Sequence, residues 1–256
     1  MIALVTGASS GIGAAAARRL AAEPGARLVL VARREERLRA LAAELGGATV
    51  VALDLTEPDA PARVREALER EHGGRLDLLV NNAGASWNAP FAEGGWANVQ
   101  RTMEVNFDAV VRLTEALLPL LRASAPSAIV NVASTAGRVG RADGGAYSAS
   151  KFALAGWSDS LHLEERPHGV HVGLVLPGFV ATEGFPQRML VDRRATRWIV
   201  SKPERVAEAI LDAGPGGRAE RYVPRAYWVA ALLRIATPRL VRRALRRSAD
   251  RLITRG

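Results

Sequence analysis

A tyrosine, a lysine and a serine in the middle of the chain have a spacing suited to acid–base chemistry. Tyr147 and Lys151 are four residues apart, which puts them on one face of a helix, and Ser134 precedes the tyrosine by thirteen residues. A free phenol has a pKa of about 10, but a cation about 4 Å away stabilises the phenolate by up to roughly 4 kcal/mol. We therefore expect Lys151 to lower the pKa of Tyr147, while Ser134 holds a carbonyl oxygen beside the phenol. The alternative is that Tyr147 packs in the core and Lys151 is a surface charge.

A second group of residues has the composition of a phosphate-binding turn. Three glycines lie in the segment Thr6–Gly13, directly after an apolar run and before an amphipathic one. Without side chains the backbone can approach a pyrophosphate, which then meets free N–H groups at the positive end of the following helix. An ordinary tight turn is the alternative. The residues that we expect to bind a dinucleotide here are Gly7, Ser9, Ser10, Gly11, Ile12 and Gly13.

The residues about twenty positions beyond this turn indicate which dinucleotide binds. An acid there binds the ribose hydroxyls, whereas an arginine accommodates a 2′-phosphate. The chain has Arg33 and Arg34 at this point and no acid, which favours NADP(H) over NAD(H). The alternative is that both arginines are solvated charges at the start of a helix. Residues that follow two later apolar runs complete the expected cofactor groove: Asp54, Leu55, Asn82, Ala83 and Gly84.

Short apolar runs alternate with longer amphipathic segments along most of the chain, and the runs are apolar on both faces, as buried parallel strands are. The expected strands are Ile2–Thr6, Arg27–Ala32, Thr49–Leu53, Leu76–Asn81, Ala128–Ala133, Val170–Leu176 and Arg221–Val223. The expected helices are Ile12–Glu23, Glu35–Leu45, Ala60–His72, Trp96–Arg122, Ala146–Arg166 and Pro203–Ala213. This alternation predicts an α/β fold with a doubly wound (Rossmann) parallel sheet and helices on both faces.

The net charge of +9 is confined to the end of the chain. Residues 218–256 contain eleven arginines and two acids, and the rest of the chain carries equal numbers of bases and acids. A neutral body is not typical of a nucleic-acid-binding protein, so we expect no nucleic-acid partner. The chain has no cysteine and four scattered histidines, and we expect no metal site. With no basic leader and no run of eighteen apolar residues, we expect a cytoplasmic protein.

Together these motifs make the chain resemble the short-chain dehydrogenase/reductase family, of the NADP-preferring type. The resemblance extends from residue 1 to about residue 224 and rests on the segments and residues Thr6–Gly13, Asn81–Gly84, Asn106, Ser134, Tyr147, Lys151 and 177–182. It implies an NAD(P)-dependent oxidoreductase with a seven-stranded Rossmann sheet formed by residues 1–224.

The resemblance also implies a role for each motif residue. Tyr147 would be the acid–base residue, Lys151 would bind the nicotinamide ribose, and Ser134 would position the substrate oxygen. Asn106 would hold a water in the proton relay. The remaining cofactor residues, of which Val180 and Thr182 would meet the nicotinamide carboxamide, are Pro177, Gly178, Val180 and Thr182.

We expect the protein to interconvert a carbonyl and a secondary alcohol on a mostly apolar small molecule with NADP(H), as a homo-oligomeric dimer or tetramer. The alternatives are an NAD-dependent alcohol dehydrogenase of the same fold and a non-catalytic nucleotide-binding sensor or scaffold. Glu183–Lys202 is a candidate lid, and the charged loop Gly140–Gly145 departs from the family pattern beside the substrate. The candidate substrate-pocket residues are Trp87, Phe91, Ala136, Phe185, Met189 and Trp198.

Residues 225–256 are expected to form a basic amphipathic helical extension. An apolar run, Ala226–Ala236, precedes Pro238, after which apolar residues recur at helical spacing with arginines largely on the other face. The favoured interpretation is that the apolar stripe packs on the body or on a second subunit. Peripheral attachment to an anionic membrane is the second interpretation, and nucleic-acid contact is the least favoured.

Overall fold

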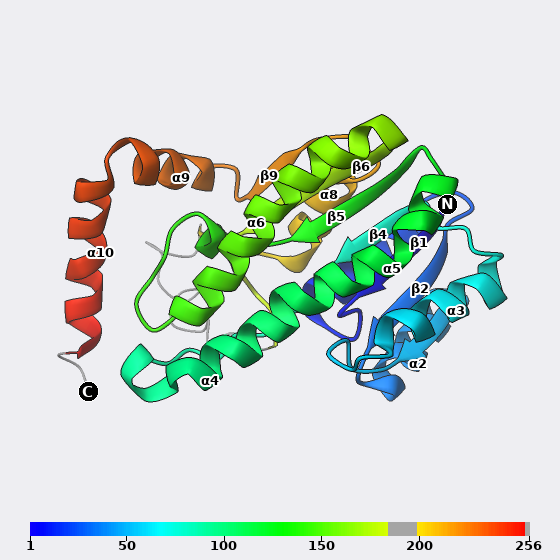
Figure 1. Cartoon of the computed structure of the whole chain (residues 1–256), viewed down its shortest axis with the longest axis horizontal. Helices are drawn as coiled ribbons and strands as arrows, with labels where there is room; N and C mark the ends of the chain where they lie inside the picture. The colour runs from blue at the N-terminus through cyan, green and yellow to red at the C-terminus, as the bar shows by residue number, and fades with distance from the viewer. Residues whose placement is uncertain (184–198, 254–256) are drawn as a thin grey trace.

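Seven parallel strands form one sheet in the order β3-β2-β1-β4-β5-β6-β9 (Figure 1). The computed structural model describes residues 1–183 and 199–253. The strands are β1 Ile2–Thr6, β2 Arg27–Ala32, β3 Thr49–Ala52, β4 Leu78–Asn81, β5 Ser127–Val132, β6 Val170–Pro177 and β9 Glu220–Val223. All seven expected strands are present, with ends that differ by two residues at most. The predicted doubly wound α/β fold is therefore confirmed.

Helices cover both faces of the sheet. They are α1 Gly11–Ala21, α2 Glu35–Glu44, α3 Ala60–His72, α4 Phe91–Met103, α5 Ala109–Ala123, α6 Gly145–Glu165 and α8 Pro203–Ala213. On one face α1, α2 and α8 pack through residues such as Leu20, Leu38 and Ile210. On the other, α3, α5 and α6 pack through residues such as Leu68 and Leu117. Each fully buried leucine contributes about 1.5–3 kcal/mol, so these two apolar layers hold the sheet.

The long helix expected over Trp96–Arg122 contains a local irregularity. A π-helical turn, Glu104–Asp108, joins α4 to α5 and contains the buried Asn106. The residues before Trp96 form an additional turn that is separated by Gly95, whose φ of 52° is outside the helical region. The spacing of apolar residues predicted the helix but not the π turn, because one extra residue in a turn hardly changes the helical repeat of apolar positions.

Chain order places a crevice between β1 and β4. β1 pairs with β2 on one side and with β4 on the other, so the chain leaves β1 in one direction and returns to the opposite side. At such a switch point the loops after the strands turn apart and leave a ligand crevice at their carboxyl ends. The loops that meet there are the Thr6–Gly13 turn and the segment after Asn81.

Two short strands and two C-terminal helices lie outside the main sheet. β7, Phe179–Val180, pairs in parallel with β8, Val200–Ser201, and neither was expected because two residues show no periodicity. The helices are α9 Tyr227–Ala236 and α10 Pro238–Ile253, and in Figure 1 α10 lies at one side of the molecule, apart from the sheet. The division into a domain of residues 1–224 and an extension of residues 225–256 stays a prediction. Among the described residues, no helix combines the length and apolarity needed to cross a bilayer.

Candidate active site

The crevice is a single cleft of about 860 Å³ that collects almost every residue singled out from the sequence. The glycine turn, the arginine pair, the segment after β4 and the Ser134–Tyr147–Lys151 group all line it. Two expected site residues, Gly13 and Asn106, do not line the cleft. Both lie behind its wall, where they support residues that do.

The glycine turn is held by close backbone contacts. Gly7 has a φ of +67°, which favours glycine, and a Cβ on Gly13 would overlap the carbonyl oxygen of Gly7. Thr6 fixes the facing loop, since its Oγ1 accepts from the backbone N–H of Asn82 at 2.9 Å and of Ala83 at 3.0 Å. The Asn82 side chain in turn donates to the Thr6 carbonyl at 2.9 Å. Thr6 was missed as a site residue, although it opens the glycine motif.

The two arginines at the end of β2 make different contacts. Arg34 donates to Ser9 Oγ at 3.0 Å and to Ser10 Oγ at 2.6 Å, so its guanidinium lies on the glycine turn. Arg33 is 77% exposed and its nearest anion is Asp54, at 3.5 Å. Both residues line the cleft, but the structure puts Arg34, rather than Arg33, among the hydroxyls where a phosphate would lie.

An acid from the far side of the cleft reaches the same cluster. Glu183 accepts a hydrogen bond from Arg37 at 2.6 Å and lies 3.7 Å from Arg34. The arginines hold the pKa of Glu183 below its ordinary value, so it is an anion at neutral pH. This carboxylate is 146 residues from Arg37 in sequence, and no local pattern indicated the pair.

Replacing Glu183 with glutamine is expected to tighten NADPH binding several-fold while leaving NADH binding unchanged. The carboxylate competes with a 2′-phosphate for Arg34, and the amide removes this competition without changing the shape of the side chain. Calorimetric dissociation constants of the variant and the parent for both cofactors measure the effect. An equal change for both cofactors, or weaker NADPH binding, would contradict the expectation.

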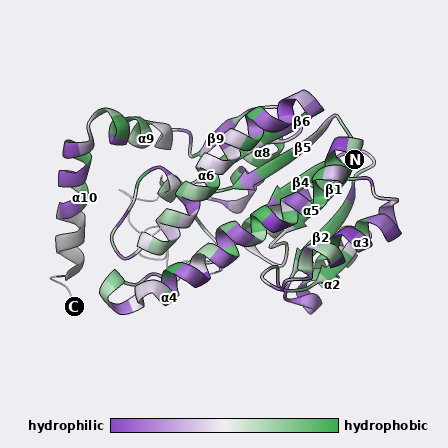
Figure 2. Ribbon diagram, viewed as in Figure 1, coloured by the Kyte–Doolittle hydropathy of each residue, from purple (hydrophilic) through white to green (hydrophobic). Residues whose placement is uncertain are grey.

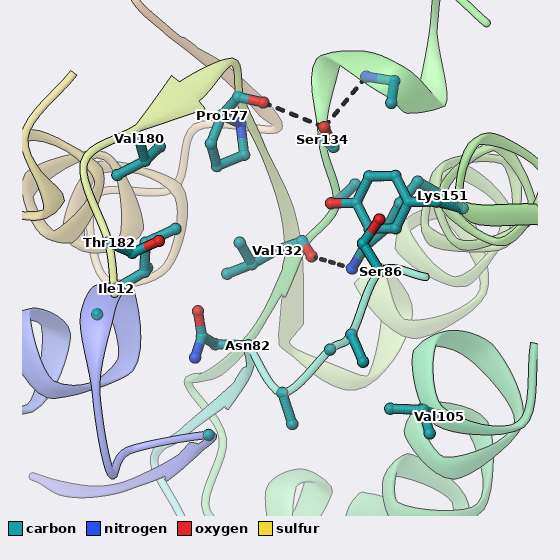
Figure 3. A pocket seen from close by; sticks show the side chains of 18 of the residues that line it. Ile12, Asn82, Ser86, Val105, Val132, Ser134, Lys151, Pro177, Val180 and Thr182 are labelled. Carbon is teal, nitrogen blue, oxygen red and sulfur yellow. Dashed lines mark hydrogen bonds between the residues drawn. The ribbon is translucent and has the colours of Figure 1, made fainter. Parts of the chain in front are cut away.

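Ser134 follows β5, and Tyr147 and Lys151 lie on α6, so the group comes together where these elements meet the cleft. Figure 3 shows Ser134 and Lys151 there. Lys151 is 3% exposed, and its Nζ donates to the Val132 carbonyl at 2.9 Å. Ser134 Oγ accepts from the backbone N–H of Ala136 at 3.1 Å and donates to the Pro177 carbonyl at 3.3 Å. These contacts exclude the interpretation of Lys151 as a surface charge and fix both groups beside the cleft.

The net shift in the pKa of Tyr147 is opposite to the lowering expected from Lys151. Burial raises the pKa of Tyr147, although a hydrogen bond with Ser134 and the charge of Arg141 partly lower it. Burial also lowers the pKa of Lys151 to about 8. Because Lys151 Nζ lies 5.9 Å from the centroid of the Tyr147 ring and bonds to a carbonyl, its attraction to the phenolate does not outweigh desolvation. Tyr147 therefore holds its proton at neutral pH.

Asn106 supports the loop opposite Lys151. Its Oδ1 accepts from the backbone N–H of Ala85 at 2.8 Å, and its Nδ2 donates to the Ala85 carbonyl at 2.9 Å and to Ser150 Oγ at 3.0 Å. The π turn aims the side chain at this loop instead of at α6 alone. These bonds make Asn106 a positioning residue, and its implied contact with a relay water stays a prediction.

The last wall of the cleft comes from the segment after β6. Pro177, Gly178, Val180 and Thr182 line it, and Figure 3 shows Val180 and Thr182 across the cleft from Lys151. A Cβ on Gly11 would lie 3.0 Å from Thr182 Cγ2, so this segment rests directly on the glycine turn. The expected cofactor residues thus meet from six separate parts of the chain: 7–13, 33–34, 54–55, 82–84, 147–151 and 177–182.

The substrate side of the cleft agrees only in part with expectation. Trp87 and Ala136 line it, but Phe91 is 76% exposed and does not, because the turn that carries it precedes the Gly95 break. The candidates Phe185, Met189 and Trp198, and most of the candidate lid Glu183–Lys202, lie outside the described residues. Arg141, from the loop expected beside the substrate, lines the cleft as well. Further lining residues, which no sequence pattern indicated, come from distant elements: Arg138, Tyr222, Tyr227 and Leu245.

Comparison with known proteins agrees with this geometry. A profile of the short chain dehydrogenase family matches residues 1–189. The chain is 36% identical to the ketoacyl reductase HetN of Nostoc sp. over 218 residues, which cover 82% of this chain and 74% of HetN. It also resembles the NADP complex of RhlG from Pseudomonas aeruginosa, with 31% identity, a TM-score of 0.78 and coverage of 88% and 95%.

A second solved structure is similar over nearly the same span. It is the L-sorbose reductase of Gluconobacter frateurii in complex with NADPH and L-sorbose, with 29% identity, a TM-score of 0.77 and coverage of 86% of this chain and 93% of the reductase. The family profile spans well over half of the chain, and its range contains both the glycine turn and the Tyr147–Lys151 pair. The chain therefore belongs to the short-chain dehydrogenase family.

Proposed function

We propose that this protein is an NADP(H)-dependent carbonyl reductase that converts a ketone on a mostly apolar small molecule into a secondary alcohol. As a member of its family the chain is an NAD(P)-dependent oxidoreductase that acts on C=O or CH–OH groups. The observation that carries the proposal is that Tyr147, Ser134 and Lys151 line one cleft together with a glycine turn and an arginine pair.

In the proposed reaction Ser134 and Tyr147 bind the ketone oxygen. Their hydroxyls approach the oxygen from one side, and the Tyr147 proton moves to it as negative charge develops. A bound nicotinamide supplies the hydride to the carbonyl carbon. Lys151, a buried cation next to Tyr147, stabilises the phenolate that remains and binds ribose hydroxyls. Proton transfer in this direction requires that Tyr147 starts the reaction with its proton, and a phenol carries its proton at neutral pH.

The phosphate on the adenosine ribose is the feature that selects the cofactor. Arg34 lies against Ser9 and Ser10, and neither the end of β2 nor the start of α2 places an acid on the glycine turn. An arginine fork binds a phosphate bidentately. RhlG was solved with NADP and the L-sorbose reductase with NADPH, which supports NADP(H) over NAD(H) for this chain.

The substrate proposed for the cleft is a ketone on an acyl chain. The lining of the cleft includes the apolar residues Trp87, Val139, Ala231 and Leu245. The similarity to a ketoacyl reductase supports a ketone close to an acyl carbonyl. We place the enzyme in the cytoplasm as a homo-oligomer; a sensor or scaffold role has no observation that favours it over catalysis.

Steady-state assays with NADPH and NADH against a set of carbonyl compounds test this function. The set pairs β-keto thioesters of increasing chain length with polar ketoses, and we expect kcat/KM to rise with chain length and to be higher with NADPH. Longer chains remove more apolar surface from water in the cleft, at about 0.8 kcal/mol for each buried methylene. Absence of turnover with every carbonyl, or preference for the ketoses, would contradict the proposal.

A further inference from the structure

The helix α9 exposes a continuous apolar surface on the side away from the body. Trp228, Leu232 and Ile235 are spaced as neighbours on one helix face and are 52%, 50% and 79% exposed. Val229 and Leu233 widen this face, with exposures of 41% and 45%. Figure 2 shows hydrophobic residues along α9. Contiguous exposed apolar surface of this kind marks an interaction site.

The chain around this apolar face carries positive charge without a counter-charge. Between Arg225 and Arg246 there are six arginines and no acid. In the part of the chain that the structure describes, none of the six forms an ion pair, whereas body arginines such as Arg19 and Arg122 do. Five of the six are exposed, and in Figure 2 hydrophilic residues recur on successive turns of α10.

The exposed apolar face could bind a second copy of the chain or a phospholipid membrane, and the positive charge of the arginines favours the membrane. In a twofold dimer the same patch of each subunit meets its copy, so two pairs of α9 and α10, each with seven arginines and one acid, would face each other and repel. An anionic phospholipid surface instead attracts each arginine and accepts Trp228 and the leucines at the depth of its headgroups. Neither helix meets the length and apolarity needed to cross a bilayer, so the contact is peripheral.

The same helices also form part of the mouth of the cleft. Tyr227, Ala230 and Ala231 of α9 and Leu245 of α10 line it. The start of α9 packs against the segment 177–182, which is expected to bind the cofactor, because the Tyr227 ring fills the space beside Gly178. The Tyr227 hydroxyl also donates a hydrogen bond to the Ile199 carbonyl at 3.3 Å. One side of α9 therefore borders the substrate and the other side presents the exposed apolar face.

We propose that α9 and α10 dock the enzyme on an anionic phospholipid membrane, with the mouth of the substrate cleft next to the lipid. The substrate class that follows is a long-chain acyl ketone dissolved in the membrane, and this second part rests on the proposed function. Apolar insertion of α9 and attraction of the arginines act together, so binding depends on anionic lipid and weakens with salt.

Co-sedimentation of the full-length protein with vesicles tests the docking without any assay of activity. Vesicles of phosphatidylcholine alone are compared with vesicles of equal parts phosphatidylcholine and phosphatidylserine. We expect binding to the second kind only, and loss of at least about a hundredfold in affinity for the variant Arg239→Glu, Arg242→Glu, Arg243→Glu, since each arginine contributes roughly fivefold. These three residues are exposed and do not line the cleft.

A matched control separates the docking surface from net charge. The variant Arg27→Glu, Arg166→Glu, Arg205→Glu makes the same change in charge at exposed arginines of the body that have no ion pair within the described residues, and we expect it to bind vesicles almost as the parent does. A second variant, Trp228→Ser with Leu232→Ser, keeps the charge and should also lose binding. The proposal is overturned if the body variant loses as much vesicle affinity as the α10 variant, or if the parent does not bind vesicles. It is also overturned if the α10 variant changes its oligomeric state but not its vesicle binding.

The substrate class has its own measurement. The α10 arginine variant should reduce a short water-soluble ketone at the parental rate, and its rate with a long-chain acyl ketone in anionic vesicles should fall at least tenfold. If the variant and the parent reduced the long-chain ketone in vesicles at equal rates, delivery of the substrate from the membrane would be contradicted, while the docking proposal would stand. Absence of turnover with either ketone in the parent would contradict the proposed function and not the docking.

Discussion

Replacing Tyr147 with phenylalanine is expected to lower kcat by a factor on the order of 100 or more, with little change in stability or in cofactor binding. The variant keeps the ring and removes only the hydroxyl that carries the transferable proton. Lys151 bonds to the Val132 carbonyl and not to the phenol, so its position does not depend on the lost group. Single-turnover rates of NADPH oxidation, together with NADPH affinity and the melting temperature, separate lost chemistry from lost binding.

Tyr222 supplies the matched control for this experiment. It also lines the cleft, but its hydroxyl interacts with Glu220 and Arg138. Burial and the Glu220 carboxylate raise the pKa of Tyr222 to about 12, although Arg138 partly lowers it. Tyr222→Phe therefore removes a hydroxyl from the same cleft without removing the proposed proton donor, and should keep kcat within a few-fold. Retention of most of the parental rate by Tyr147→Phe, or equal losses in both variants, would refute the assigned role.

Replacing Arg34 with alanine is expected to weaken NADPH binding by roughly tenfold to a hundredfold and to leave NADH binding nearly unchanged. A hydrogen bond to a charged group contributes about 1.5–3 kcal/mol, and only NADPH carries the phosphate that Arg34 would bind. Arg34 lies 2.6 Å from Ser10 Oγ, whereas Arg33 is 77% exposed near Asp54, so Arg33→Ala should have the smaller effect.

Calorimetric dissociation constants for both cofactors measure this selectivity. Arg39→Ala is the control, because Arg39 is an exposed arginine of α2 that pairs with Glu35 and does not line the cleft. It should change neither constant. Tighter binding of NADH than of NADPH to the parent protein, or a loss in Arg34→Ala that is equal for both cofactors, would show that the arginine pair does not select the phosphate.

The sequence by itself determined the sheet and the positions of its motifs. Buried parallel strands require apolar residues on both faces, and this local requirement identified all seven strands. The glycine turn and the Tyr147–Lys151 pair could also be predicted, because a tight turn and a shared helix face depend on residues that are near neighbours in the chain. Since parallel strands align their carboxyl ends, the order of the elements predicted that the glycine turn meets the residues after the later strands at one cleft, and the family resemblance added the Tyr147–Lys151 pair.

Only the tertiary structure decided the electrostatics of the site. The direction in which the pKa of Tyr147 shifts depends on how completely distant elements remove water from Tyr147 and Lys151. The spacing of residues along the chain does not predict this desolvation. The choice between Arg33 and Arg34, the approach of Glu183 to Arg37, and the exposure of Phe91 likewise depend on contacts between distant segments. Desolvation and charge pairing act through space, whereas a sequence pattern reports only what neighbouring residues require of one another.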